Sequence, residues 1–177
     1  MNCRVEKSEI NGKIVCPPNK SYTHRAIFLA TLADGKSIIK NILKSGDTYS
    51  TINACKNFGA EIKNVGNDIT VNSTGELKLQ SDTIDAANSG TTIRIATAIS
   101  TLSSDKIFLT GDSSLKKRPM QPLLDALESL DAKCSSSNGN PPISISGKIK
   151  GGEVKISGSV SSQFISALMI TAPKLEK

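Results

Sequence analysis

The sequence contains few aromatic residues and no tryptophan: two tyrosines and four phenylalanines stand singly among 177 residues. Proteins that bind single-stranded nucleic acid without reading its sequence stack the bases on aromatic side chains placed among basic ones. That interleaved pattern is missing here. The composition therefore disfavours a nucleic-acid-binding module, although the formal net charge of +6 keeps it open as an alternative.

Long apolar runs are missing as well. No run approaches the roughly 18 residues that a membrane-spanning helix needs. The opening stretch, MNCRVEKSEING, has neither the basic start nor the apolar segment of a signal peptide. We therefore expect a cytoplasmic protein that makes no membrane contact.

Groups for metal or disulfide chemistry are scarce. The four cysteines lie far apart without a CxxC pair, and His24 is the only histidine. Neither a zinc site nor a disulfide framework is favoured by this spacing. We expect no bound metal and reduced, mostly buried thiols.

Basic residues, in contrast, are in excess: 22 lysines and arginines face 16 acidic residues. Such an excess favours anionic partners, either phosphate-bearing metabolites or nucleic acid. Because stacking aromatics are missing, small anions are the better match. The length is sufficient for one domain, or somewhat more, with a sizeable core.

The chain contains an internal repeat. Residues 20–73 predict the order helix, strand, helix, strand, strand, and residues 88–147 predict the same order again. Arg25 and Arg94 are 69 residues apart, and matching pairs further along are 72 and 74 apart. Residues 159–177 repeat only the opening helix. We expect an α+β (α/β) fold of repeated βαβαββ units, with parallel strands from βαβ crossovers, antiparallel hairpins and an incomplete third unit.

Local signals place several element ends. In the first unit, Ala26, Leu29, Ala30 and Ala33 predict the buried face of a helix, and Gly35 is expected to stop it. A second helix is expected at residues 45–60, and strands are expected at residues 37–39, 60–65 and 68–73.

Capping residues support the same assignment. Ser45 and Asp47 are alternative caps of the second helix, and Gly59 is its expected terminator. In the second unit, Pro119 is expected to start the second helix.

Each unit opens with small or polar residues at a helix N-terminus: NKS (19–21), NSGT (88–91) and SSQ (161–163). Unpaired N–H groups and the helix dipole make such an end favourable for phosphate or carboxylate. Three of these ends together can hold a large anionic substrate.

Cations accompany the first helix start, PPNKSYTHRA (17–26). The two prolines keep the chain extended, and Ser21 or Asn19 can cap the helix. Lys20 and Arg25 place positive charge at its mouth, where arginine suits bidentate phosphate recognition. A plain cap for Ser21 and a solvated helix face for Arg25 are the alternatives.

The second unit supplies further candidates. Gly90 has no Cβ and lets an anion approach the backbone N–H. Arg94 lies one turn further in, where a structural role is open. Lys116 and Lys117 fit a solvated basic loop, whereas Arg118, beside a rigid proline, is the better candidate for a fixed anion contact.

In combination, these motifs resemble those of the 5-enolpyruvylshikimate-3-phosphate synthase family. The resemblance depends on PPNKSYTHRA, LADG, SGDT, NFGAEI, NSGTTIR, LTGDSSLKKRPM and above all GSVSSQFISALMITAP (158–173). It covers nearly the whole chain. Asn19 departs from the family pattern, which usually has Gly-Ser before its Lys-Ser.

The resemblance implies an activity and a set of site residues. The family transfers the enolpyruvyl (carboxyvinyl) group of phosphoenolpyruvate to the 5-hydroxyl of shikimate 3-phosphate and releases phosphate, in the shikimate pathway to chorismate and the aromatic amino acids. No metal or organic cofactor is implied. The residues implied for shikimate 3-phosphate are Lys20, Ser21, Arg25, Ser161, Ser162 and Gln163. Those implied for phosphoenolpyruvate are Lys20, Gly90, Arg118 and Gln163, with Lys20 catalytic and Asn88 a second-rank candidate.

The family's architecture adds expectations about domains. Its members have two domains of three units each, in an inside-out barrel-like arrangement, with the active site between them. Residues 1–12 would form an initial strand of the other, absent domain, and residues 13–177 the substrate-binding domain. Because the missing C-terminal domain would complete the site, this chain alone is expected to bind ligands with little or no turnover.

Two other functions stay open at this point. A sibling family adds enolpyruvate to UDP-N-acetylglucosamine, but it usually has Lys-Asn where this chain has Lys20-Ser21, and it lacks the SSQF run. A basic RNA-binding module would predict an affinity that falls steeply with salt.

Overall fold

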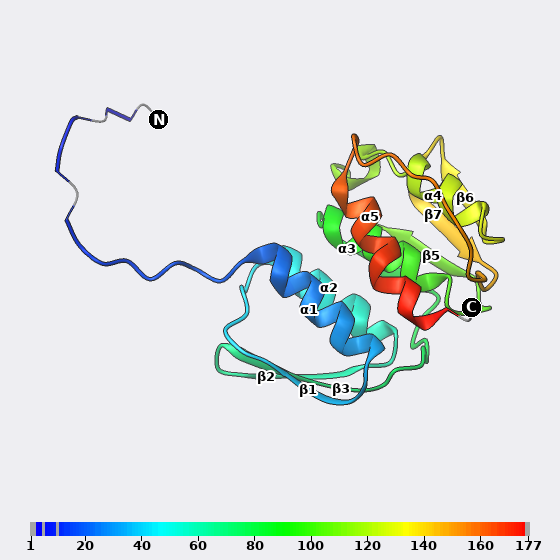
Figure 1. The fold of residues 1–177 in the computed structure, drawn as a ribbon, viewed down its shortest axis with the longest axis horizontal. Helices are drawn as coiled ribbons and strands as arrows, with labels where there is room; N and C mark the ends of the chain where they lie inside the picture. The colour runs from blue at the N-terminus through cyan, green and yellow to red at the C-terminus, as the bar shows by residue number, and fades with distance from the viewer. Residues whose placement is uncertain (1–2, 5, 10, 176–177) are drawn as a thin grey trace.

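The computed structural model describes residues 3–175 except residues 5 and 10, and places four of its helices, α1, α2, α3 and α5, between two outer sheets (Figure 1). The helices are α1 (Lys20–Leu32), α2 (Gly46–Asn57), α3 (Gly90–Ser100), α4 (Gln121–Glu128) and α5 (Ser162–Thr171), with short 3-10 helices η1 (Leu115–Lys117) and η2 (Ala172–Lys174). The strands are β1 (Asp34–Ile39), β2 (Glu61–Val65), β3 (Asp68–Thr74), β4 (Thr83–Asp85), β5 (Ile107–Thr110), β6 (Lys133–Ser137) and β7 (Asn140–Ser146).

The two sheets belong to the two units that the repeat predicts. The first sheet is antiparallel in the order β1-β3-β2, and its β2–β3 hairpin turns at Gly66-Asn67 as expected. The second has the order β4-β5-β7-β6. Its β4 and β5 are parallel and joined through α3, which is the predicted βαβ crossover, while the other pairs are antiparallel. The α+β class is confirmed.

The predicted buried face of α1 is right for Ala30, which is buried, and wrong for Leu29 and Ala33. Leu29 is 50% exposed and Ala33 is exposed, whereas Ile27, Phe28 and Leu32 are buried. The helix packs on β3 on one side and against α2 and α3 on another, so it buries residues around more of its circumference than one stripe.

The stop signal at Gly35 is also misplaced. Helix α1 ends at Leu32 because Ala33 already has extended backbone angles, and Gly35 lies inside β1. Gly59, with a φ of +101°, does end α2 as expected. Ser45 is the cap of α2, in a reciprocal capping box with Thr48.

Pro119 does not start the second helix of the second unit. Helix α4 begins at Gln121, Met120 is its cap, and Pro122 is the proline in its first turn. Proline fits there because the first-turn N–H groups have no partner inside the helix.

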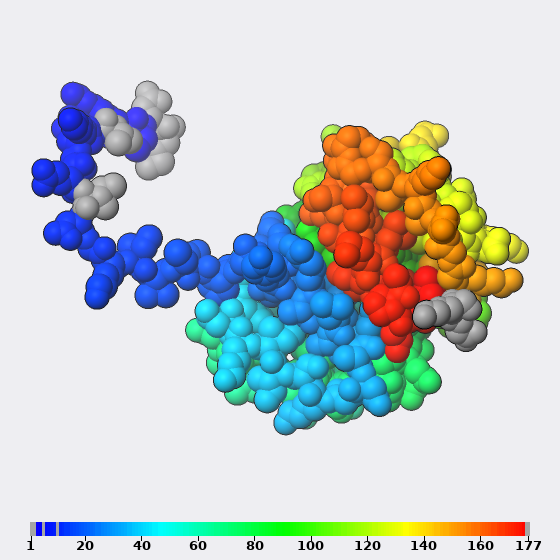
Figure 2. Space-filling view, viewed as in Figure 1, coloured from blue at the N-terminus to red at the C-terminus, as the bar shows by residue number. Residues whose placement is uncertain are grey.

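The segment before α1 stands clear of the rest of the molecule (Figure 2). Residues 3–18, as far as described, form no helix or strand, and Ile14 and Val15 are 90% and 97% exposed. Residues 1, 2, 5 and 10 of the expected initial strand lie outside the described residues. The assignment of residues 1–12 to another domain stays a prediction.

The core is continuous through both units and contains three fully buried phenylalanines, Phe28, Phe58 and Phe164. The prediction of mostly buried cysteines is wrong for two of the four. Cys3 and Cys16 are exposed in the extended segment, whereas Cys55 is buried and Cys134 half-buried. Burial raises the pKa of the Cys55 thiol to about 12, so it stays protonated at neutral pH.

Candidate functional site

The three helix starts predicted to bind anions are all capped N-termini. Asn19, Ser89 and Ser161 each accept a hydrogen bond from a backbone N–H in the following turn, at 2.9, 3.2 and 3.2 Å. Asn19 therefore caps α1, which resolves the choice between it and Ser21. The Ser21 side chain lies within the exposed first turn of the helix.

Side chains join the starts of α3 and α5. Gln163 donates from Nε2 to the hydroxyl of Thr91 at 2.9 Å, and its Oε1 accepts from Nη1 of Arg94 at 2.7 Å. Thr91 lies in the first turn of α3 and Arg94 at the start of its second turn, and the two helices pack side by side. The second and third helix starts therefore face a common region.

The start of α1 is joined to the same region through α2. Lys20 Nζ pairs with the carboxylate of Asp47 at 2.7 Å, and the backbone carbonyl of Asp47 is 3.4 Å from the hydroxyl of Thr92 on α3. Asp47 thus contacts the first turns of both α1 and α3. The four helices α1, α2, α3 and α5 present their N-terminal ends to one part of the molecule, as the direction of α1 and α5 in Figure 1 also indicates.

Beneath these ends runs a buried chain of polar side chains. His24 Nδ1 is 2.6 Å from the hydroxyl of Thr51, which is 2.7 Å from that of Thr92, which in turn donates to Ser89, the cap of α3, at 2.7 Å. The other ring nitrogen of His24 is buried without a partner among the described residues.

This environment keeps His24 neutral. Burial lowers the pKa of His24 from 6.5 to about 4; the carboxylate of Asp47 opposes this shift, and the charge of Lys20 adds to it. At neutral pH the histidine therefore fixes α1 against α2 and α3 without contributing charge to the anion region.

A tight loop carries Arg118 to the start of α3. The carboxylate of Asp112 accepts from the backbone N–H groups of Ser114 and Leu115 and from the Ser114 hydroxyl, at 2.8–2.9 Å. The pKa of Asp112 lies below its usual range. The hydrogen bond from Leu115 is the largest cause, followed by those from Ser114, and the charge of Arg118 adds to them. A Cβ at Gly111 would lie 2.4 Å from the carbonyl oxygen of Ala87, so only glycine lets this loop approach so closely.

Two guanidinium groups lie beside Gly90. A Cβ added there would come within 2.6 Å of Nη1 of Arg118 and 3.6 Å of Nη1 of Arg94. Within the described residues, ion pairs join only Arg4 to Glu6 and Lys20 to Asp47. Neither arginine therefore has a carboxylate partner there, and burial, followed by the charge of Arg118, lowers the pKa of Arg94.

The remaining predicted residues lie on the same helix starts but outside this bonded network. Arg25 donates from Nε to the carbonyl of Ser21 at 3.2 Å and lies over the Tyr22 ring at 5.3 Å. Asn88 is exposed in the turn before α3, and Ser162 is the exposed first residue of α5. The described hydrogen bonds do not tie these side chains to Arg94 or Arg118.

Sequence reasoning missed three features of this region. The sequence predicts only a helix cap at Asp47, although a carboxylate in the first turn of the next helix is a suitable partner for Lys20. The sequence Asp112-Ser113-Ser114 is typical of an Asx turn, in which the aspartate side chain accepts from a backbone N–H two residues on. This pattern could have predicted the loop. The His24–Thr51–Thr92 chain had no signal, because its members are 27 and 41 residues apart.

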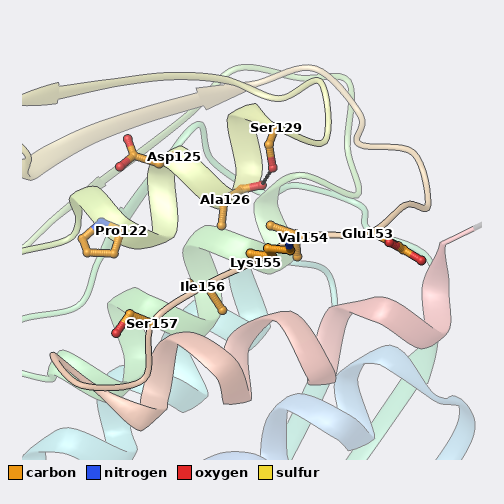
Figure 3. A pocket seen from close by; sticks show the side chains of 9 residues that line it. All are labelled: Pro122, Asp125, Ala126, Ser129, Glu153, Val154, Lys155, Ile156 and Ser157. Carbon is orange, nitrogen blue, oxygen red and sulfur yellow. Dashed lines mark hydrogen bonds between the residues drawn. The ribbon is translucent and has the colours of Figure 1, made fainter.

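A cavity of about 730 Å³ elsewhere in the molecule contains none of the predicted residues. It lies between α4 and residues 153–157, and Figure 3 shows its lining, with Asp125 and Glu153 as its carboxylates and Lys155 as its cation. Two carboxylates against one cation make this cavity unsuitable for a multiply charged anion.

The described residues contain neither a metal-ligand cluster nor a membrane-spanning helix. No three or more histidine, cysteine, aspartate or glutamate side chains in the described part are grouped as a metal site would require. None of its helices has the length and apolar character needed to cross a membrane.

Comparison with known proteins identifies relatives across the whole chain. Residues 5–177 match the family model described as EPSP synthase (3-phosphoshikimate 1-carboxyvinyltransferase). The 3-phosphoshikimate 1-carboxyvinyltransferase of Nitrosopumilus maritimus (strain SCM1) is 58% identical over 177 residues, which are 100% of this chain and 42% of that protein. The protein of the same name from Methanosarcina mazei is 50% identical, over 99% of this chain and 41% of its own length.

A solved structure agrees with these matches. EPSP synthase from Acinetobacter baumannii superposes with a TM-score of 0.84 at 28% identity, over 93% of this chain and 39% of that one. The chain thus spans about two fifths of the length of the relatives that it matches. Its motifs, its repeated α+β units and these relatives together establish that the chain belongs to the EPSP synthase (3-phosphoshikimate 1-carboxyvinyltransferase) family.

Proposed function

We propose that this chain supplies the substrate-binding part of an enzyme that transfers the enolpyruvyl group of phosphoenolpyruvate to the 5-hydroxyl of shikimate 3-phosphate. The 5-hydroxyl oxygen bonds to C2 of phosphoenolpyruvate as the hydroxyl loses its proton and C3 takes up a proton, which gives a tetrahedral intermediate. Loss of inorganic phosphate from C2 and of a proton from C3 then restores the double bond and completes the transfer. The relatives with 58% and 50% identity carry the name of this activity.

The observation that carries the proposal is the set of adjoining helix N-termini with two arginines that lack carboxylate partners among the described residues. The two substrates together bear two phosphates and two carboxylates. Bringing them into contact requires extensive neutralisation, because like charges repel strongly at short range. Fixed cations and N–H groups can supply it and can stabilise the charged intermediate.

Shikimate 3-phosphate is assigned to the starts of α1 and α5. Lys20, Ser21 and Arg25 would bind it from the first unit. The residues assigned to it on the third helix start are Ser161, Ser162 and Gln163. Lys20 lies 2.7 Å from Asp47, so a bound phosphate has to compete with this carboxylate.

Phosphoenolpyruvate is assigned to the start of α3. Arg118 lies against the Gly90 backbone, where a guanidinium and a helix N-terminus can hold the same anionic group. Lys20 and Gln163 would contact both substrates, which makes Lys20 the candidate catalytic residue. Asn88, exposed in the turn before α3, is the second-rank candidate for shaping this pocket.

The chain covers about two fifths of the length of its relatives, which supports the proposal that binding and catalytic residues are divided between two domains. We assign residues 13–177 to the substrate-binding domain, and residues 1–12 to an initial strand that pairs in another domain. That domain would supply the acid–base residue for the 5-hydroxyl and further cations. The 177-residue chain is therefore expected to bind ligand but to release phosphate from the two substrates far more slowly than a full-length relative.

Calorimetric titration of the chain with shikimate 3-phosphate tests the proposal. Arg25→Met is expected to weaken binding about 10- to 100-fold, because a hydrogen bond from a charged group contributes about 1.5–3 kcal/mol. Lys36 is an exposed lysine of β1 in the first sheet. Lys36→Met is therefore the matched control and is expected to change the affinity less than about twofold.

Two results would overturn the assignment. One is equal affinity for inorganic phosphate and shikimate 3-phosphate in the wild-type chain. The other is tight binding of single-stranded RNA, steeply weakened by salt, with no response to shikimate 3-phosphate.

A further inference from the structure

Gln163 is held in one orientation by its two partners. Arginine has only N–H donors, so the atom of Gln163 that faces Nη1 of Arg94 at 2.7 Å has to be the carbonyl oxygen. The amide nitrogen then faces Thr91 and donates to its hydroxyl at 2.9 Å. One of the two amide hydrogens is used in this way, and the second has no partner among the described hydrogen bonds.

Arg94 is placed at some energetic cost. Its guanidinium is half-buried, has no carboxylate partner among the described residues and lies near the positive Arg118. Its Nε is buried without a hydrogen-bond partner in the described part of the chain. A charge held in this way is expensive unless it has a specific task.

The remaining contacts of Arg94 fix its direction. Its guanidinium lies 5.0 Å from the centre of the Phe164 ring, next to Gln163 on α5. Phe164 is fully buried, so the ring cannot move aside. Packing on this ring directs the guanidinium toward the amide oxygen of Gln163 across the α3–α5 boundary.

We propose that Arg94 is a positioning residue that fixes the side-chain amide of Gln163 as a hydrogen-bond donor toward the bound anion. This inference rests on the proposed function of Gln163 in ligand binding. Arg94 affects binding through Gln163 and does not contact the ligand itself. Without Arg94, the amide can rotate and present its oxygen, which repels a phosphate or carboxylate.

A double-mutant cycle measured by calorimetric titration of the full 177-residue chain with shikimate 3-phosphate tests this coupling. Arg94→Met keeps the apolar stem of the side chain but removes the guanidinium that lies over Phe164 and bonds Gln163. It is expected to weaken binding about five- to tenfold, and Gln163→Ala by a similar factor. The double variant is expected to bind no more than about twofold more weakly than Gln163→Ala alone. Multiplication of the two effects would show direct ligand contact by Arg94 and overturn the proposal.

Lys106→Met is the matched control. Lys106 also lies 5.0 Å from a phenylalanine ring, that of Phe108, but it immediately precedes β5, between that strand and the C-terminal end of α3 in the chain. Its loss is expected to leave the affinity within about twofold. Arg94→Lys retains a donor to Gln163 and is expected to recover part of the lost affinity. Equal losses in Arg94→Lys and Arg94→Met, accompanied by a fall in melting temperature, would indicate a merely structural role and overturn the proposal.

A second measurement needs no ligand. In the 15N-correlated NMR spectrum, the side-chain NH2 pair of Gln163 is identified by its disappearance in Gln163→Ala. The two protons give separate signals in any glutamine, because the amide C–N bond has partial double-bond character. In the wild-type chain their shifts are expected to differ from those of a solvent-exposed glutamine, and Arg94→Met is expected to move them toward those values. If this occurs but shikimate 3-phosphate does not bind, the proposed function fails while the orientation of Gln163 holds. Unchanged signals in Arg94→Met would overturn the inference itself.

Discussion

The first and second units share the order helix, strand, helix, strand, strand. They differ in whether the cations at their helix starts have a carboxylate partner. In the first unit, Lys20 at the helix start is paired with Asp47 at 2.7 Å. In the second, Arg94 and Arg118 lie together at Gly90 without a carboxylate partner among the described residues. Among the described residues, the second unit therefore holds its arginines without an ion pair, although the charge of Arg118 acts on Asp112. A bound anion gains more there than at Lys20, where it displaces an existing partner.

The units differ in their sheets as well. Strand β4 precedes α3 and pairs in parallel with β5, whereas the segment before α1 is extended and exposed, so the first sheet has three strands and the second four. The outer edge of β1 has no neighbour among the described residues. A β-branched pair, Ile14-Val15, precedes α1 at a position similar to that of β4 before α3. The same unit can thus be built with or without its leading strand.

The charge difference predicts the largest effect on binding. Arg118→Met is expected to weaken phosphoenolpyruvate binding about 10- to 100-fold, because an unpaired guanidinium makes charge-assisted hydrogen bonds of about 1.5–3 kcal/mol. Lys20→Met is expected to weaken it only about two- to fivefold, since loss of the half-exposed pair with Asp47 offsets part of the change. Calorimetric titration in the presence of shikimate 3-phosphate measures both.

Lys117→Met is the control for this pair, because Lys117 is an exposed residue of η1 next to Arg118. Its affinity should stay within about twofold of the wild type. A loss in Lys20→Met as large as that in Arg118→Met would remove the contrast between the units.

Local patterns were sufficient for most of the fold and for the helix starts of the site. The caps of α1 and α2, the terminator Gly59 and the β2–β3 hairpin depend on residues next to one another in the chain. Strand β4, only three residues long, gives too weak a periodic signal to be found alone. The Arg94–Gln163 bond joins residues 69 apart, and the Lys20–Asp47 pair joins residues 27 apart. Such contacts depend on how units pack, which periodicity does not encode.

The pH dependence of stability also distinguishes the two units. By the repeat spacing, Ile93 takes the place in α3 that His24 has in α1, so only the first unit buries a titratable group at this position. The pKa of His24 is lowered from 6.5 to about 4, so between these values the unfolded chain binds a proton that the folded chain does not. Stability therefore falls as the pH falls, by about 2 kcal/mol between pH 7 and pH 5.

Urea unfolding at pH 7, 6 and 5 measures this slope. His24→Leu removes the only histidine of the chain and is expected to abolish most of it, at the cost of lower stability at pH 7. A slope in His24→Leu equal to that of the wild type would assign the pH dependence to carboxylates of either unit.

The smallest expected effect is on phosphoenolpyruvate affinity, when each of two glycines that begin helices in the two units is replaced by alanine. Gly90→Ala places a methyl group 2.6 Å from Nη1 of Arg118, whereas Gly46→Ala, at the start of α2, meets nothing within 4 Å. Because the obstructed atom is the end of a flexible side chain, Arg118 can move aside, and the free energy of unfolding should change by less than about 1 kcal/mol in both variants. Phosphoenolpyruvate affinity should fall about three- to fivefold in Gly90→Ala alone, since the displaced guanidinium no longer shares the anion with the start of α3. Equal affinities in the two variants would mean that Arg118 does not need the space beside Gly90, and the unpaired charge of the second unit would then not be aimed at this helix end.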